Sequence, residues 1–110
     1  MISATFIFIP GEFDARFHQL DGEIASYARQ TEGYIGEDSW EDSKTGRVAN
    51  VYYWQDETGL RQLMQHPSHL LAKQDQQAWL EGYQVIISQV LRSYGNQQLS
   101  AAAISTAQNI

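Results

Sequence analysis

The order in which the chain switches between strand-like and helix-like hydrophobic patterns leaves few folds open. Ser3–Ile9 is rich in β-branched and aromatic residues and stops at Pro10-Gly11, as a strand does before a turn. From Glu12 to Gln30, apolar residues recur every three or four positions, which predicts a helix with one buried face and water-facing side chains that include Asp21. The later predicted elements are a hairpin of strands at Tyr34–Glu41 and Arg47–Trp54, a helix at Asp56–Gln65, a helix from Pro67, and a strand at Tyr83–Leu91. This β-α-β-β-α-β order predicts a ferredoxin-like α+β domain with a four-stranded antiparallel sheet.

Both sides of the predicted strands are apolar. A single domain of this kind needs apolar side chains only on the face of the sheet that its helices cover. The first strand places Phe6 and Phe8 on one side and Ile7 and Ile9 on the other, and the last strand behaves in the same way. Helices cover only one face of such a sheet, so a monomer would expose roughly several hundred Å² of apolar surface. We therefore expect homodimerisation through the sheets.

Composition excludes several classes of partner. The formal net charge is -6, which repels nucleic acid and anionic lipid surfaces. The absence of cysteine excludes disulfides, thiolate metal sites and cysteine nucleophiles. The apolar run Ile2–Ile9 is far shorter than the roughly 20 residues of a membrane span, so we expect a cytoplasmic protein. One domain is predicted over residues 1–95, followed by a tail without charged side chains over residues 96–110.

The chain resembles a known family from about Ile2 to Gly95, most specifically from Tyr52 onward. The matching features, in order, are Tyr52-Tyr53-Trp54, Asp56-Glu57, His66-Pro67-Ser68-His69, Trp79 and the stretch Tyr83–Tyr94. In this order they resemble the antibiotic biosynthesis monooxygenases. The resemblance implies a dimeric α+β barrel and a cofactor-free monooxygenase that oxidises an electron-rich anthrone, phenol or quinol with dioxygen, without haem, flavin or metal. Such chemistry requires a base, hydrogen-bond donors for the developing oxyanion and a dry aromatic pocket.

His69 is the candidate catalytic base. It falls on the helical face predicted to include Trp79 and Tyr83, so its ring is expected to point inward, where it could accept a proton near neutral pH. The alternative is a core histidine bonded to a backbone carbonyl. His66 and His69 lack a third ligand, so no metal site is predicted, and His66 is expected to end the preceding helix.

A planar substrate could be bound by aromatic side chains and one amide. The candidate substrate-binding residues are Asn50, Tyr52, Trp54, Trp79 and Tyr83. Trp40 and Tyr53 could also contribute, although aromatic residues of this kind also form cores and dimer interfaces. The acidic residues Glu37, Asp38, Glu41 and Asp42 surround the predicted hairpin and are expected to form a solvated edge.

Three other functions follow from the same fold. A non-catalytic dimeric module that binds a small ligand or another protein is the main alternative. Haem degradation is disfavoured by the resemblance. The haem-degrading branch needs an Asn, a Trp and a His, and near the corresponding positions this chain has Phe6 or Phe8, Leu63 and Lys73. RNA recognition is disfavoured by the acidic net charge.

Overall fold

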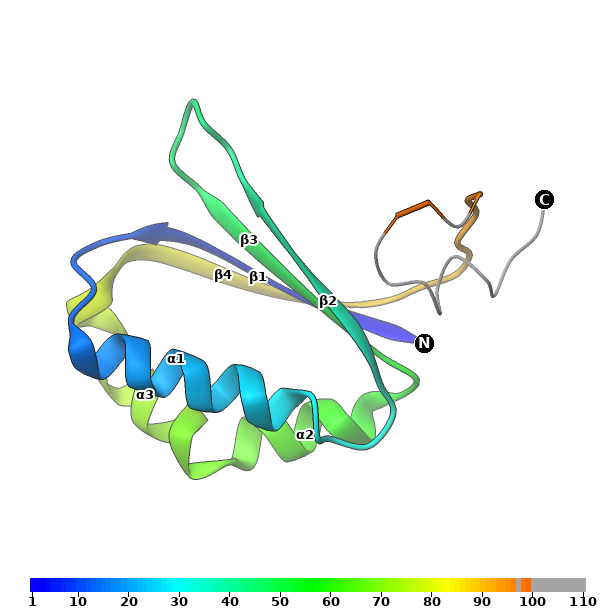
Figure 1. Cartoon of the computed structure of the whole chain (residues 1–110), viewed down its shortest axis with the longest axis horizontal. Helices are drawn as coiled ribbons and strands as arrows, with labels where there is room; N and C mark the ends of the chain where they lie inside the picture. Colours follow the sequence, from blue (N-terminus) through cyan, green and yellow to red (C-terminus); the bar gives the residue numbers. More distant parts are fainter. Residues whose placement is uncertain (97, 100–110) are drawn as a thin grey trace.

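The structure, a computed structural model, describes residues 1–96, 98 and 99. Four strands form one antiparallel sheet in the order β2-β3-β1-β4, and three helices lie together on one side of it (Figure 1). The elements are β1 (Ile2–Pro10), α1 (Ala15–Ala28), β2 (Tyr34–Glu41), β3 (Val48–Trp54), α2 (Glu57–Gln65), α3 (Pro67–Trp79) and β4 (Leu80–Gln89). The predicted ferredoxin-like α+β fold is confirmed. The predicted tail at residues 96–110 falls mostly outside the described part, so the domain boundary stays a prediction.

Side-chain caps fix where the helices begin. The Asp14 carboxylate accepts a hydrogen bond from the backbone N–H of Phe17 at 2.9 Å, so α1 begins at Ala15 and not at Glu12. His66 ends α2 as predicted, and its Nδ1 accepts from the backbone N–H of Ser68 at 3.2 Å, which also caps α3. No helix in the described residues is both long enough and apolar enough to span a bilayer.

The junction between α3 and β4 corrects the sequence analysis. The prediction that Tyr83 continues the helical face of His69 and Trp79 is wrong, because α3 ends at Trp79 and Tyr83 lies in β4. The backbone N–H of Gly11 donates to the Trp79 carbonyl at 2.7 Å, and Leu80 already pairs with Pro10. The strand that pairs with β1 therefore begins at Leu80, three residues before its predicted start at Tyr83.

The strand register divides the sheet into an inner face toward the helices and an outer face without helices. Phe6 pairs with Asn50 on β3 and with Val85 on β4, so these three side chains share the inner face. The inner-face residues of β1, β3 and β4 are Ala4, Phe6, Phe8, Val48, Asn50, Tyr52, Trp54, Tyr83, Val85 and Ile87. The outer face carries Thr5, Ile7, Ile9, Ala49, Val51, Tyr53 and Ile86, with Trp40 on β2.

Trp54 is the centre of the core and has no exposed surface. Its indole N–H donates to the hydroxyl of Thr31 at 2.7 Å, and that hydroxyl donates to the carbonyl of Ala28 at 2.6 Å. Gly59 of α2 lies directly against the indole, where a Cβ would overlap the ring and the carbonyl oxygen of Glu32. The fold therefore needs glycine at position 59 for close packing of α2 on the sheet.

Substituting the two helical glycines with alanine should have opposite effects on stability. Gly59→Ala places a Cβ well inside van der Waals contact with Trp54 and should lower the free energy of unfolding by about 1 to 3 kcal/mol. Gly22→Ala in α1 meets nothing within 4 Å and should raise it by about 0.5 to 1 kcal/mol. Urea unfolding of both variants checks this pair, and equal effects would contradict the packing described here.

Candidate functional site

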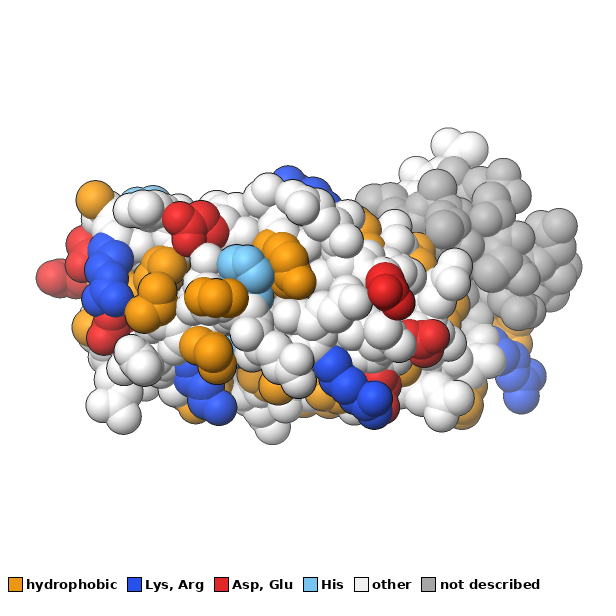
Figure 2. All heavy atoms as spheres, turned by 90° about the horizontal axis from the view of Figure 1, so that it is seen from below, with side chains coloured by type: hydrophobic (Ala, Val, Ile, Leu, Met, Phe, Trp, Pro, Cys, Tyr) orange, Lys and Arg blue, Asp and Glu red, His pale blue; other side chains and the backbone are white. Residues whose placement is uncertain are grey.

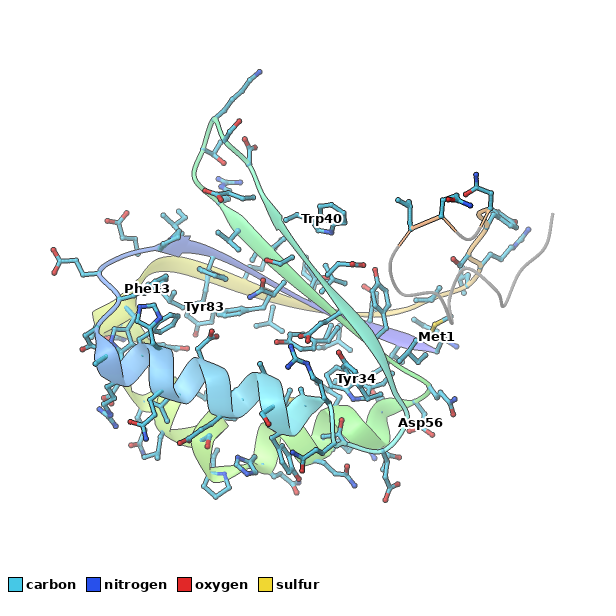
Figure 3. The ribbon with its side chains drawn as sticks, in the orientation of Figure 1. Met1, Phe13, Tyr34, Trp40, Asp56 and Tyr83 are labelled. Atoms are coloured by element: carbon cyan, nitrogen blue, oxygen red, sulfur yellow. The ribbon has the colours of Figure 1, made fainter. Side chains whose placement is uncertain are left out.

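The inner face is only partly covered by the helices. Ala4 and Phe8 on β1 are buried, but Tyr83, Val85 and Ile87 on β4 are 50%, 53% and 43% exposed although they point to the helix side. Figure 3 shows Tyr83 and Phe13 at one end of the space between helices and sheet, and Tyr34 at the other. An apolar wall along β4 is therefore accessible to a ligand from this side.

Aromatic side chains form one end of this surface. The rings of Phe6 and Tyr83 meet edge to face with centroids 6.2 Å apart, and the Gln76 side-chain amide donates to the Tyr83 hydroxyl at 2.8 Å. Trp79 is buried under Phe17, with ring centroids 5.5 Å apart. Tyr83 thus lies at the surface, where a ligand can reach it, whereas Trp79 is buried against α1.

Asn50 is oriented by its neighbour on β2. The Ser39 hydroxyl donates to the amide oxygen of Asn50 at 2.7 Å, which leaves the two amide N–H groups of Asn50 as donors on the inner face. Asn50 is the cross-strand partner of Phe6, so these donors lie next to the aromatic end of the surface. An amide held in this way can stabilise a negative oxygen on an aromatic ligand.

Tyr52 belongs to a polar network at the β2 edge. It is the cross-strand partner of Glu37, and burial, followed by the charges of Glu37 and Asp21, raises the Tyr52 pKa well above the usual range. Arg29 from the end of α1 donates through Nε to the Glu37 carboxylate at 2.8 Å. Glu37 therefore faces inward and is ion-paired, which corrects its prediction as part of a solvated edge, whereas Glu41 and Asp42 are exposed as predicted.

His69 lies in the first turn of α3 and is half-buried. Its Nδ1 is buried and has no hydrogen-bond partner among residues 1–96, 98 and 99. Burial, and then the nearby Lys73 charge, lowers its pKa, so the imidazole is neutral at pH 7 and can accept a proton. Trp79 follows ten residues later, roughly 15 Å along the helix, so the two do not form one small site. Its role as base stays a prediction.

The predicted site residues are thus only partly brought together. Asn50, Tyr52 and Tyr83 share the inner face and offer polar or aromatic groups to it. Trp54 shares that face but is completely buried, so it shapes the wall without offering free surface. Tyr53 and Trp40 lie on the outer face.

Asp21 on α1 is exposed, as the sequence analysis expects. It lies four residues after Phe17, which contacts Trp79 of α3, and three before Ile24, which packs against the core. Burial, and then the Glu37 charge, raises the pKa of Asp21, although His18 opposes this shift.

Two open hollows are lined by other residues, except that Ile87 of β4 borders the first. One, of about 650 Å³, lies where the start of α2 meets the ends of β1 and β4, and another, of about 660 Å³, lies beside His66 and Ser68. Neither contains a predicted site residue. Within the described part of the chain, no group of three or more His, Asp or Glu side chains could hold a metal ion.

The antiparallel sheet with helices on one side defines a ferredoxin-like α+β subunit, and solved structures narrow this class. No protein-family model and no curated protein matches the chain. Rv0793 of Mycobacterium tuberculosis matches 84% of this chain and 96% of its own at 15% identity, with a TM-score of 0.69. SnoaB, a cofactor-independent oxygenase from Streptomyces nogalater, matches 84% of this chain and 94% of its own at 14% identity, with a TM-score of 0.66.

A proposed antibiotic biosynthesis monooxygenase from Deinococcus radiodurans matches 84% of this chain and 95% of its own at 15% identity, with a TM-score of 0.66. The chain therefore has the fold of the antibiotic biosynthesis monooxygenases, as its sequence predicts.

The lowered pKa of His69 predicts how stability depends on pH. Because its pKa is below 6.5 in the folded chain, the unfolded chain binds more protons between that value and 6.5, and stability falls as the pH drops through this window. His69→Gln should reduce the pH slope of the unfolding free energy between pH 7 and 5 by up to about 1.4 kcal/mol per pH unit. Urea unfolding across this range measures it, with exposed His18→Gln as the control. Equal slopes in wild type and His69→Gln would show that His69 is not desolvated.

Proposed function

We propose that this protein is a cofactor-independent monooxygenase that oxidises a small electron-rich aromatic of the anthrone, phenol or quinol type with dioxygen. The observation that carries the proposal is the pair of Asn50 amide donors, oriented by Ser39, beside the exposed aromatic wall of Phe6 and Tyr83. The fold shared with SnoaB, described as a cofactor-independent oxygenase, supports the same reaction class.

The reaction on an anthrone illustrates the proposed roles. Neutral His69 takes a proton from the ring CH₂, and the negative oxygen of the anion accepts hydrogen bonds from Asn50. The anion passes one electron to dioxygen, and the resulting radical and superoxide combine to a peroxide that takes the proton back. Loss of water then leaves a quinone carbonyl, so one oxygen atom enters the product and the other leaves as water.

Oxygen uptake tests this proposal directly. The purified protein should consume dioxygen with a panel of anthrones and quinols without added metal, flavin or haem. Asn50→Ala should lower kcat by about 10² to 10³, the usual effect of losing one oxyanion donor, while Gln77→Ala on the exposed side of α3 leaves it unchanged. Ligand binding without oxygen uptake by any of the panel would instead support the non-catalytic module.

We also propose that two copies pair through their outer faces. Ile7 and Val51 occupy neighbouring strands there, and on the same face Trp40 is 61% and Ile86 41% exposed. In the subunit, no described helix covers this side (Figure 1). A second copy would bury these side chains and produce the barrel that the sequence analysis expects.

Light scattering coupled to gel filtration tests the pairing. Wild type should have about twice the 12.5 kDa mass of one chain, because burial of the outer face stabilises the dimer. Ile7→Lys places a charge at the middle of that face and should give a folded monomer. A wild-type monomer at micromolar concentration, or a dimer that Ile7→Lys leaves intact, would contradict the proposed interface.

A further inference from the structure

The hollow beside His66 lies between α1 and the start of α3 and has a volume of about 660 Å³. One wall is a stripe of α1 and the residues just after it, because the lining positions 19, 22, 26 and 30 recur at steps of three and four. The other wall is the start of α3, with His66 and Ser68. The space is therefore formed by the helices alone and is separate from the inner face of the sheet.

Gly22 is the feature of this hollow that packing does not explain. It lies in the middle of α1, where a glycine costs about 1 kcal/mol relative to alanine. A Cβ at this position would meet nothing within 4 Å, whereas the glycine at position 59 is required by the ring of Trp54. Glycine also occurs where a ligand must approach the backbone closely. A molecule bound over the open backbone would account for Gly22.

Two stacked rings supply the apolar part of the hollow. Tyr27 of α1 and His66 both line it, and their ring centroids are 3.9 Å apart with the planes inclined by 30°. The Nδ1 atom of His66 accepts a hydrogen bond from the backbone N–H of Ser68, so the ring proton lies on Nε2. This wall thus offers ring surface together with one N–H donor.

Glu23 supplies the negative charge of the hollow. Its carboxylate accepts a hydrogen bond from the buried hydroxyl of Ser68 at 2.7 Å and another from the side-chain amide of Gln19 at 3.4 Å. No lysine or arginine is among the lining residues, so nothing there compensates this charge. The helix side carries acidic and basic side chains in separate places among apolar ones, so no large positive patch covers it (Figure 2). Negatively charged ligands are therefore disfavoured.

We propose that the hollow beside His66 binds a neutral saccharide. Each hydroxyl of a sugar both donates and accepts hydrogen bonds, and so do the amides of Gln19 and Gln30 and the hydroxyl of Ser26, which all line the hollow. The C–H groups of the sugar ring would pack against the stacked rings. A wholly apolar ligand would leave the polar lining without partners. This inference does not depend on the proposed monooxygenase, because the hollow shares no residue with the inner face.

Titration of ¹⁵N-labelled protein at pH 7 with D-glucose, D-glucuronate and D-glucosamine tests this proposal. These three sugars are neutral, anionic and cationic. Glucose should shift the backbone amides of Gly22, Tyr27 and Ser68 and bind at least about tenfold more tightly than glucuronate, which the Glu23 carboxylate repels. Glucosamine should bind no more tightly than glucose, because both oxygens of Glu23 already accept hydrogen bonds. Glu23→Gln keeps an oxygen that can accept from Ser68 and should reduce the preference for glucose over glucuronate.

Two further variants separate binding from folding. Gly22→Gln fills the open space and should lower the affinity for glucose by about tenfold or more, while the melting temperature stays the same or rises because glutamine favours a helix more than glycine does. Ala78→Gln adds the same side chain to an exposed residue of α3 and is the matched control. Unchanged glucose binding by Gly22→Gln, an equal loss in Ala78→Gln, tighter binding of either charged sugar, or no shift with millimolar glucose would overturn the inference.

Discussion

The burial of Trp54 is the constraint on which the arrangement of the site depends. Its indole donates to Thr31 after α1, lies against Gly59 of α2 and stacks on Tyr52, with ring centroids 5.8 Å apart. Because strand side chains alternate, an inward Trp54 also turns Tyr52 and Asn50 inward. One buried ring thus holds two helical segments against β3 and orients the polar groups of the inner face.

The sheet leaves two apolar surfaces that differ in kind. The outer face is free of charged side chains on β1 and β3, which suits a second copy of the same surface. The inner face combines the polar groups of Asn50 and Tyr52 on β3 with exposed apolar side chains on β4, which suits a small ligand with polar groups. Pairing of the outer faces would leave the inner faces open, so assembly and ligand binding do not compete.

The fold could be predicted from the sequence because each strand and helix pattern agreed with the next. Pro67, for example, restricts His66 to extended geometry and starts α3, which a local pattern shows directly. The end of α3 could not be predicted in this way. The helical spacing from His69 continues to Tyr83, but pairing of Leu80 with Pro10 is a long-range interaction that no local pattern contains.

The candidate site was predictable only where alternation decides the direction of a side chain. Asn50, Tyr52 and Tyr83 fall on one face because of strand periodicity and the register. Glu37 was assigned to water because of its charge, yet strand alternation places it on the face of Tyr52, where Arg29 pairs with it. Charge alone is a poor guide to direction when a side chain of opposite charge lies within reach.

The central claim is that ligands bind to the inner face near Asn50. Chemical shifts of the side-chain amide of Asn50 in ¹⁵N-labelled protein, recorded as 2-naphthol is added, test it most directly. The account predicts that this amide shifts strongly together with the backbone of Phe6, its cross-strand partner, and of Val85, which pairs with Phe6 on the other side. Shifts confined to the outer face around Val51 and Ile86, or to the hollow beside His66, with Asn50 unchanged, would contradict it.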